Sequence, residues 1–168
     1  FKPKLIVIVG PTASGKSALA VNLAKKFNGE IISADSRQVY KNLNIGAAKV
    51  TKKEMKGIRH HLLDVADPKK IFTVAEYKNL AEIAFKKIIG RGRQPILCGG
   101  TGFYVRTIID NLLIPEVKPN FALRKKLGEK SASELFGILK RKDPVRAKTI
   151  DPKNPRRLVR ALEIISAL

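Results

Sequence analysis

The feature that most constrains the fold is the run Gly-Pro-Thr-Ala-Ser-Gly-Lys-Ser at residues 10–17. It has the G-x-x-x-x-G-K-S spacing of a phosphate-binding P-loop, and it follows a short apolar run at 5–9 and precedes helical spacing over 16–27. Glycines let the backbone curl so that several N–H groups point at one anion, and the N-terminus of the following helix adds a positive dipole end. We therefore expect a pyrophosphate or triphosphate to bind here.

Each position of this loop has an expected task. The mobile charge of Lys16 suits phosphate oxygens, and the Ser17 hydroxyl is placed to coordinate Mg²⁺, the one cofactor that the sequence predicts. The remaining residues would form the cradle: Gly10, Pro11, Thr12, Ala13, Ser14 and Gly15.

The first two thirds of the chain alternate between strand and helix patterns. Short β-branched or apolar runs predict buried strands at 5–9, 30–34 and 95–98. Apolar residues at helical spacing predict helices over 16–27, 74–89 and 103–113, the second opened by Thr73 and Glu76 as a capping box. The segment 37–67 is mixed and is expected to be rich in loops. This alternation predicts an α/β fold, namely a P-loop NTPase-like parallel sheet with flanking helices and right-handed crossovers.

The texture changes after residue 114. Pro115 and Pro119 punctuate a linker, and helical patterns follow over 122–128, 133–141 and 156–168 with no strand pattern between them. We expect a P-loop core over 1–113 and a mainly helical segment over 114–168. Because the last apolar pattern runs to the final residue, this helical domain is expected to be incomplete.

The charge balance points to a polyanionic partner. The chain carries 34 Lys and Arg residues against 14 Asp and Glu residues, a formal charge of +20, which attracts nucleic acid above all. A general enrichment in lysine that serves solubility is the alternative. The single cysteine, Cys98, excludes an internal disulfide and is expected to be a small core residue. No apolar run approaches the roughly 20 residues of a membrane span, and no leader precedes the P-loop, so a soluble cytoplasmic protein without a membrane partner is expected.

Two polar residues follow predicted strands and should lie beside the P-loop. Ligands of doubly wound sheets bind outside the carboxyl ends of the strands, where Asp35 and Thr101 are expected. Asp35 could hold a metal ion, take a proton or cap a turn. Thr101 could donate to a phosphate oxygen, cap the next helix, or do both. The strand at 95–98 ends in glycines, so the second acid of an ordinary nucleotide hydrolase is not obvious.

Several further stretches carry a family resemblance when they are taken together with the P-loop. They are D-S-R-Q-V-Y at 35–40, I-G-A-A-K at 45–49, H-H-L-L-D at 60–64, V-A-E-Y at 74–77, G-G-T-G-F-Y at 99–104 and R-L-V-R-A-L-E at 157–163. In this order they resemble the tRNA dimethylallyltransferases, also called tRNA isopentenyltransferases, of the bacterial type.

The resemblance implies transfer of a dimethylallyl group from dimethylallyl pyrophosphate to an adenine amine, just 3′ of the tRNA anticodon. Asp35 would be the general base and Thr101 a second catalytic residue, and Thr101 would hold the pyrophosphate with Lys16, Ser17 and Mg²⁺. The partner would be the anticodon stem-loop of tRNA, bound by a monomer. The implied tRNA contacts are Asp35, Ser36, Arg37, Gln38, Thr101, Arg124, Arg156, Arg157 and Arg160.

The chain departs from the family pattern in two motifs, at 46–50 and 153–157, and in length. It has Ala47 where the family has threonine and Arg156 where the family has glutamine, and family members are longer. Two other functions stay open: an adenylate isopentenyltransferase acting on free nucleotides, and a P-loop kinase or RNA-binding ATPase.

Other polar and aromatic residues have less definite expectations. His60 and His61 are expected to be structural, because adjacent histidines point in different directions, and Asp64 is expected to cap a turn or pair with an arginine. Tyr40 and Tyr104 could stack on a base or pack in the core. The basic run at 140–142 could contact RNA or form a solvated helix face.

Overall fold

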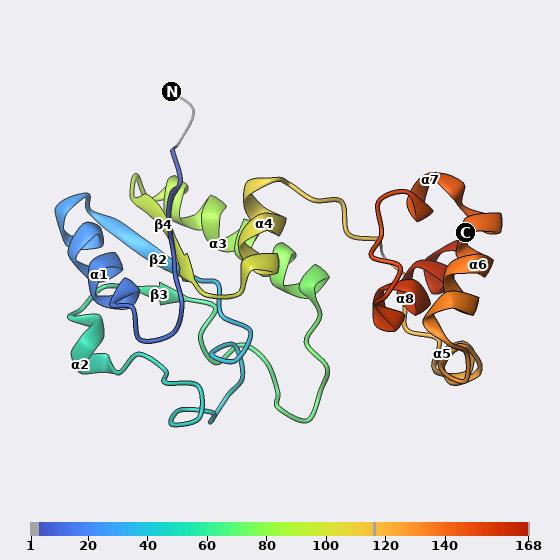
Figure 1. The fold of residues 1–168 in the computed structure, drawn as a ribbon. Helices are drawn as coiled ribbons and strands as arrows, with labels where there is room; N and C mark the ends of the chain where they lie inside the picture. The colour runs from blue at the N-terminus through green and yellow to red at the C-terminus, as the bar shows by residue number, and fades with distance from the viewer. Residues whose placement is uncertain (1–3, 116, 168) are drawn as a thin grey trace. The chain divides into compact units, whose positions relative to one another are not determined.

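The computed structural model describes residues 4–115 and 117–167, and it divides into two compact units, Phe1–Ile114 and Pro115–Leu168 (Figure 1). The first unit is a layered α/β domain and the second is a bundle of helices. Each unit has its own hydrophobic core and is described by itself.

The sheet of the first unit has the order β1-β4-β2-β3, and its neighbouring strands are parallel. The strands are β1 (Ile6–Val9), β2 (Gly29–Ser33), β3 (His60–His61) and β4 (Gln94–Gly99). Every residue of β2 is buried, because helices cover both faces of a parallel sheet. The predicted parallel α/β fold is confirmed.

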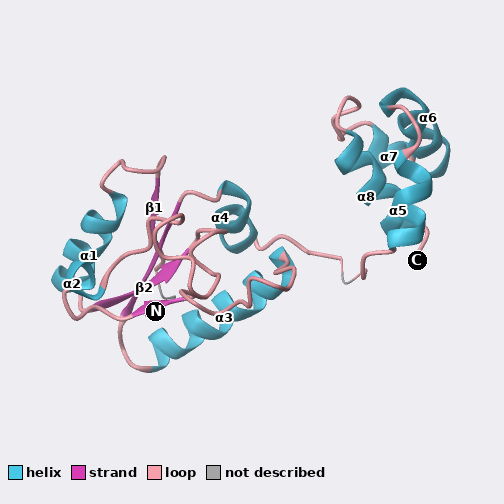
Figure 2. Ribbon diagram, turned by 90° about the horizontal axis from the view of Figure 1, so that it is seen from below, coloured by secondary structure: helices cyan, strands magenta, loops and turns pink. Residues whose placement is uncertain are grey.

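Helices pack on the two faces of this sheet through separate clusters of apolar side chains (Figure 2). On one face, α1 (Lys16–Lys26) buries Ala20, Val21 and Ala24 against Ile31 and Ile96. On the other face lie α3 (Val74–Gly90), which begins with the expected Thr73–Glu76 capping box, and α4 (Gly102–Ile109). No helix of the described part of the chain is long and apolar enough to cross a bilayer.

Helix α4 is shorter than its sequence pattern predicts. The pattern extends to residue 113, whereas the helix ends at Ile109. Asp110 then accepts from the Arg106 guanidinium at 3.0 Å, and Asn111 adopts a left-handed φ of 43°. A left-handed residue stops a helix, and asparagine tolerates that conformation better than most residues.

Two short elements lie in the segment 37–67, which the sequence analysis left without secondary structure. Helix α2 (Lys52–Met55) is a single turn held by a capping box between Thr51 and Glu54. Strand β3 consists of His60 and His61 and pairs with Ile31 and Ile32 of β2. Neither element is long enough to show a hydrophobic period, so local capping and tertiary pairing define them instead.

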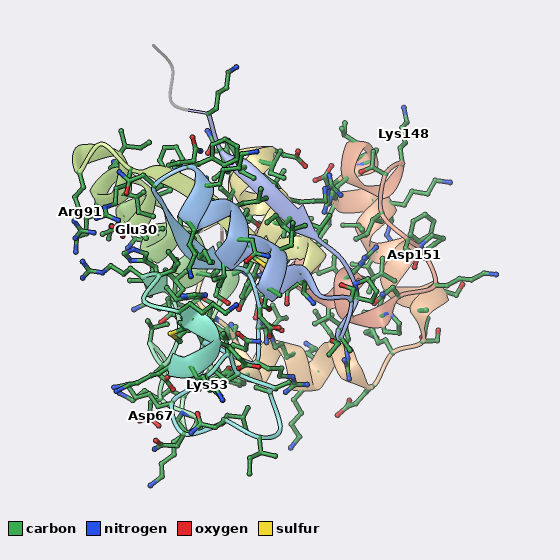
Figure 3. All side chains as sticks on the ribbon, turned by 90° about the vertical axis from the view of Figure 1, so that its left-hand side faces the viewer. Glu30, Lys53, Asp67, Arg91, Lys148 and Asp151 are labelled. Carbon is green, nitrogen blue, oxygen red and sulfur yellow. The ribbon has the colours of Figure 1, made fainter. Side chains whose placement is uncertain are left out.

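The edge strand β3 is tied to β2 by a buried carboxylate (Figure 3). Glu30, with a side chain 3% exposed, accepts from His61 Nε2 at 2.6 Å and from Arg91 Nη1 at 3.1 Å. Arg93 Nε lies 3.6 Å away. Burial alone would raise the pKa of Glu30, but the hydrogen bond and charge of His61, with those of Arg91, lower it instead. His61 thus has the structural role that was expected of the pair, whereas His60 lines a small cavity together with Ser17 and Gln38.

The second unit consists of α5 (Phe121–Gly128), α6 (Ala132–Lys142), α7 (Pro144–Ala147) and α8 (Pro155–Ile165). Its core contains Leu127, Leu135, Leu139, Leu158 and Leu162. Side chains cap each helix start, among them Ser131 with Glu134 before α6, and Asn154 before α8. The single turn α7 was not predicted, although Asp143 caps it and Pro144 opens it. The predicted helix over 156–168 ends earlier, at Ile165, and residue 168 lies outside the described residues.

Candidate active site at the carboxyl edge of the sheet

The P-loop joins the end of β1 to the start of α1. Ala13 and Gly15 both have left-handed backbones, with φ of 63° and 79°, and these turns curl the loop. The Lys16 ammonium lies over the loop and donates to the Pro11 carbonyl at 2.8 Å, while the Ser17 side chain is exposed. The first turn of α1 holds no acidic residue, so the positive end of its dipole is not neutralised locally.

Two glycines at the end of β4 allow three strand ends to approach one another. A Cβ on Gly99 would lie 2.1 Å from the carbonyl oxygen of Ala34, the residue that follows β2. A Cβ on Gly100 would lie 3.3 Å from the Gly10 carbonyl oxygen and 4.0 Å from Lys16 Cε. Because side chains are absent at both positions, the ends of β1, β4 and β2 meet at one place.

Asp35 lies directly after β2 and is held by the turn that it begins. Its Oδ1 accepts the backbone N–H of Arg37 at 2.8 Å and that of Gln38 at 3.2 Å. Among the described residues, no hydrogen bond is made to Oδ2 of this half-buried side chain. Asp35 is thus a turn cap, and one carboxylate oxygen remains available for chemistry.

Thr101 connects the end of β4 to the Asp35 turn. Its Oγ1 accepts the backbone N–H of Ser36 at 2.9 Å and donates to Ser36 Oγ at 3.2 Å. Thr101 occupies the cap position of α4, but its side chain makes no capping bond to that helix. Thr101 was expected to cap α4 or to donate to a phosphate oxygen. Its backbone begins α4, and its hydroxyl bonds Ser36 instead of capping the helix.

A cavity of about 310 Å³ opens beside Ser17. Its walls come from one side of α1 and from the segment around α2. The lining residues are Ser17, Ala18, Val21, Asn22, Ala48, Val50, Glu54 and Lys56. A much smaller cavity of about 20 Å³ shares Ser17 and Val50 with it and is also lined by Gln38 and Cys98. Sequence reasoning named Ser17 and Ala48 as parts of motifs, but it did not predict that they line one cavity with residues of α1 and α2.

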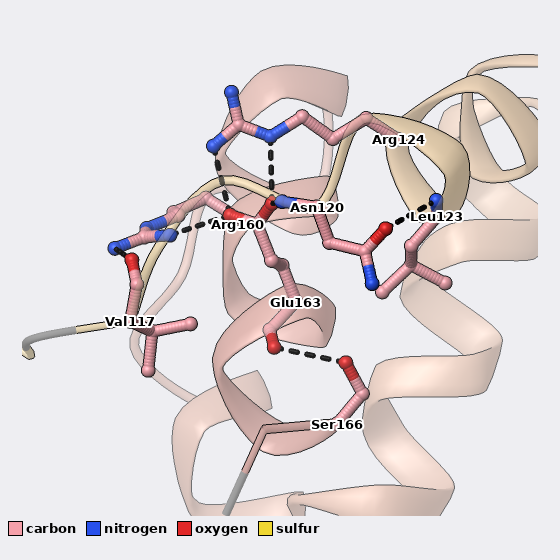
Figure 4. A network of polar contacts seen from close by, with 7 residues as sticks. All are labelled: Val117, Asn120, Leu123, Arg124, Arg160, Glu163 and Ser166. Carbon is pink, nitrogen blue, oxygen red and sulfur yellow. Dashed lines mark hydrogen bonds and ion pairs between the residues drawn. The ribbon is translucent and has the colours of Figure 1, made fainter.

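The helical unit contains four of the arginines expected to bind tRNA, and two of these four are engaged with Glu163 (Figure 4). The Arg124 guanidinium donates to both carboxylate oxygens of Glu163 at 2.8 Å. Arg160 donates to Glu163 and, at 3.0 Å, to the Val117 carbonyl. The hydrogen bonds from Arg124, followed by those from Arg160 and the Asn120 N–H, lower the pKa of Glu163 to about 2 despite its burial.

The other two arginines, Arg156 and Arg157, are exposed in the first turn of α8. The arginines of this unit that were predicted to bind tRNA thus form two pairs. The inner pair, Arg124 and Arg160, binds a buried acid, and the outer pair, Arg156 and Arg157, faces solvent. No hydrogen bond joins either outer side chain to another described residue. The inner pair can act by holding the helices in place, whereas the outer pair is available to a ligand.

The tyrosine and the cysteine near the site are core residues. Tyr104 is 6% exposed and stacks on Tyr77 with 3.9 Å between ring centroids, so its ring packs in the core and does not face a ligand. Burial raises the pKa of Tyr104, and Tyr40, Glu76 and Asp35 add to the effect. Cys98 is 8% exposed, as expected of a core residue, and burial raises its pKa to about 11 although Lys16 opposes the shift.

The family model described as "IPP transferase" matches residues 38–168 of this chain. The chain belongs to the IPP transferase family. The match begins after the P-loop, so it rests on the Asp35 turn's later residues, the Gly99–Thr101 region and the helical unit. The P-loop is therefore evidence independent of the match to the family model.

Relatives in this family are close in sequence and in structure. A tRNA dimethylallyltransferase of Oceanobacillus iheyensis is 46% identical over 98% of this chain, and one of Thermoanaerobacter is 48% identical over 96%. The crystal structure of the full-length tRNA isopentenylpyrophosphate transferase of Bacillus halodurans is 44% identical over 98% of this chain and 56% of its own, with a TM-score of 0.67. A eukaryotic dimethylallyltransferase described as acting on tRNA is 34% identical over 97% of this chain and 41% of its own, with a TM-score of 0.83.

This member of the family spans about half the length of the curated relatives that it matches, covering 54% and 52% of the two named here. Thr101 lies within the residues that the family model matches, whereas the P-loop and Asp35 precede them.

Proposed function

We propose that the protein containing this chain transfers the dimethylallyl group of dimethylallyl pyrophosphate to the exocyclic amine of the adenine 3′ of the tRNA anticodon. The observation that carries this proposal is the meeting of three strand ends, which brings the P-loop, Thr101 and Asp35 to one edge of the sheet. Membership of the IPP transferase family and relatives named tRNA dimethylallyltransferase support it.

The P-loop suits a pyrophosphate that departs during the reaction. In the transfer, the bond between the prenyl carbon and the pyrophosphate oxygen breaks, and both of its electrons stay with the pyrophosphate. Positive charge at the P-loop would stabilise the negative charge that the leaving group gains. It comes from the backbone N–H groups curled at Ala13 and Gly15, from the Lys16 ammonium and from the dipole of α1. Lys16 would exchange its bond to Pro11 for a phosphate oxygen.

The oxygen atoms near the loop fit Mg²⁺. This ion prefers oxygen ligands, keeps several waters, and is often held by one or two protein groups together with substrate phosphates. Ser17 offers an exposed hydroxyl, and no cluster of three or more His, Cys, Asp or Glu side chains competes for a metal within the described residues. When bound, Mg²⁺ would neutralise charge on the pyrophosphate.

Asp35 suits the acceptor side of the reaction. The adenine amine forms the new bond to the prenyl carbon and loses a proton, which Oδ2 of Asp35 can accept while Oδ1 stays fixed by two backbone N–H groups. The adenine must leave its stack to reach this site, at a cost of a few kcal/mol that is lowest in single-stranded RNA. Phosphate contacts by a chain of charge +20, including Arg156 and Arg157, would help to offset that cost.

The test uses the complete gene product, labelled dimethylallyl pyrophosphate and an anticodon stem-loop RNA. Asp35→Asn should lower transfer by at least about 100-fold, within the range for a general base. Asp67→Asn is the matched control, because Asp67 also caps a turn, accepting the Lys69 N–H at 2.9 Å, and is exposed (Figure 3). No transfer by the folded wild-type protein to any RNA with the right adenine would overturn the proposal. Preference for AMP would instead indicate an enzyme of free nucleotides.

A further inference from the structure

Lys49 lies in an unusual position for a lysine. Its side chain is only 6% exposed, and its ammonium donates to the Tyr40 carbonyl at 2.8 Å and to Asp64 Oδ1 at 2.6 Å. An ammonium is seldom buried unless acceptors replace its lost water, because an unpaired buried charge is costly. Asp64 was expected to cap a turn or pair with an arginine, and its partner is this lysine instead.

One of the two bonds of Lys49 ends on the turn that carries Asp35. We call residues 35–40 the acceptor turn. It begins with Asp35 capping the Arg37 and Gln38 N–H groups and ends at Tyr40, whose carbonyl Lys49 binds. The segment 64–66 supports the same turn, since the Asp64 N–H donates to Gln38 and the Val65 N–H to Val39.

The loop that contains Lys49 also borders the cavity beside Ser17. Ala48 and Val50 line that cavity, whereas Lys49 between them reaches Tyr40 and Asp64. The Gln38 side-chain amide lies 3.4 Å from the carbonyl oxygens of Ala47 and Ala48. This loop therefore contacts the acceptor turn through the Lys49 ammonium and through the Ala47 and Ala48 carbonyls, which accept from Gln38, while Ala48 and Val50 also line the cavity beside Ser17.

We propose that Lys49 is a positioning residue that holds the acceptor turn, and through it Asp35, in the geometry required for transfer. The inference deepens the proposed function and rests on it for its catalytic part. Its structural part is that the acceptor turn depends on Lys49 and its ion pair with Asp64. This part can be tested without any measurement of activity. Lys49 contacts no reacting atom and acts only through the turn.

The first experiment measures amide hydrogen exchange in the complete gene product and needs no activity. In Lys49→Met, exchange at the Arg37 and Gln38 amides should accelerate at least about tenfold, while the amides of β2 and β4 keep their rates, because opening is local. Lys53→Met is the matched control, since it removes the same charge from an exposed position of α2 (Figure 3). Unchanged exchange at Arg37 and Gln38, or equal acceleration throughout the sheet, would overturn the proposal.

The second experiment separates positioning from general damage. Lys49→Met should lower the rate of transfer to stem-loop RNA about tenfold or more, whereas its affinity for pyrophosphate with Mg²⁺ should match that of the wild type. Lys49→Arg should restore part of the lost rate, because it keeps a donor cation. Asp64→Asn tolerates the left-handed φ of 57° and should resemble Lys49→Met, and the double variant should be no worse than the single ones.

The outcomes distinguish the two proposals. Inactivity of the wild-type protein contradicts the proposed function but leaves the exchange result to decide on the Lys49 contact. Equal loss of rate and of pyrophosphate affinity in Lys49→Met contradicts the positioning role. So does a double variant of Lys49 and Asp64 whose loss of rate is the full combination of the two single losses.

Discussion

The Thr101 hydroxyl accepts the backbone N–H of Ser36 at 2.9 Å, although 65 residues separate the two in the chain. This bond joins the end of β4 to the acceptor turn, and Thr101 Oγ1 also donates to Ser36 Oγ. The contact explains how a threonine that follows β4 can affect an aspartate that follows β2. It also leaves the Thr101 oxygen with capacity for a further hydrogen bond, because a hydroxyl has two lone pairs.

Replacement of this hydroxyl should therefore reduce activity more than stability. Thr101→Val keeps the branched shape but leaves the Ser36 N–H without its acceptor, which costs about 1–3 kcal/mol when water cannot replace it. We expect transfer to fall about 100-fold, as for loss of a preorganised hydrogen-bonding group. Thr101→Ser retains the hydroxyl and should keep most of the activity in a side-by-side rate assay. Equal rates for the two variants would contradict this role of the hydroxyl.

Gly99 should be the least replaceable glycine of the site. A Cβ there would lie 2.1 Å from the oxygen and 2.3 Å from the carbonyl carbon of Ala34, so either β2 or β4 must shift. Gly99→Ala is expected to lower the free energy of unfolding in urea by about 3 kcal/mol, at the upper end of the range for overpacking. Gly102→Ala is the control, because no atom lies within 4 Å of its added Cβ and it begins α4. Similar midpoints for the two variants would contradict the close approach.

The sequence predicts those parts of the fold that have a period or a motif. Strand β2 is recognised as a short apolar run and helix α3 by the helical spacing of its apolar residues. The P-loop is recognised because its spacing is specific. Helices α2 and α7 and strand β3 were missed because each is too short for a period. Strand order also decides which strand ends meet, and that order depends on tertiary pairing.

In the candidate site too, residues in a local pattern could be predicted, whereas contacts between distant positions could not. Asp35 and Thr101 could be proposed from their places after strands, but the Thr101–Ser36 bond and the Lys49–Asp64 pair join positions distant in sequence. Arg124 and Arg160 were expected at the RNA. The i,i+3 spacing of Arg160 and Glu163 on α8 favours a pair, but nothing in the sequence around Arg124 indicates that it binds Glu163, 39 residues away. Residues that act through a partner elsewhere in the chain lack a local pattern.

Cys98 should report on the closure of the site. Its pKa of about 11 makes the reactive thiolate scarce at pH 8, about 100-fold scarcer than for a thiol near the usual value of 9.0, and its side chain is buried. We expect alkylation by iodoacetamide to be at least about 100-fold slower in the folded protein than in urea, and to quicken with rising pH. Since Sγ contacts the Lys16 carbonyl at 3.6 Å, pyrophosphate with Mg²⁺ should slow the reaction further. Fast labelling at pH 8 would contradict this environment.

Glu163 should make the helical unit less stable as the pH falls. Its pKa falls from the usual 4.5 to about 2 on folding, chiefly through the bonds from Arg124. A lowered folded pKa stabilises the protein above the unfolded pKa, and this contribution is lost as the pH falls from about 4.5 towards 2. Its size is at most about 3 kcal/mol, because both arginines are more than one-third exposed and solvent weakens the pairs.

Glu163→Gln tests this dependence. The variant keeps the shape of the side chain but leaves Arg124 and Arg160 without a carboxylate, so we expect about 3 kcal/mol less stability near pH 7, as when a buried pair loses one partner. Between pH 4.5 and 2 the wild type should lose more of its unfolding free energy than the variant, as measured by urea titrations followed by circular dichroism. Glu134→Gln is a matched control, since Glu134 lies in the same unit but is exposed and only caps α6. Parallel pH profiles for the wild type and Glu163→Gln would show that the carboxylate does not stabilise α5 against α8.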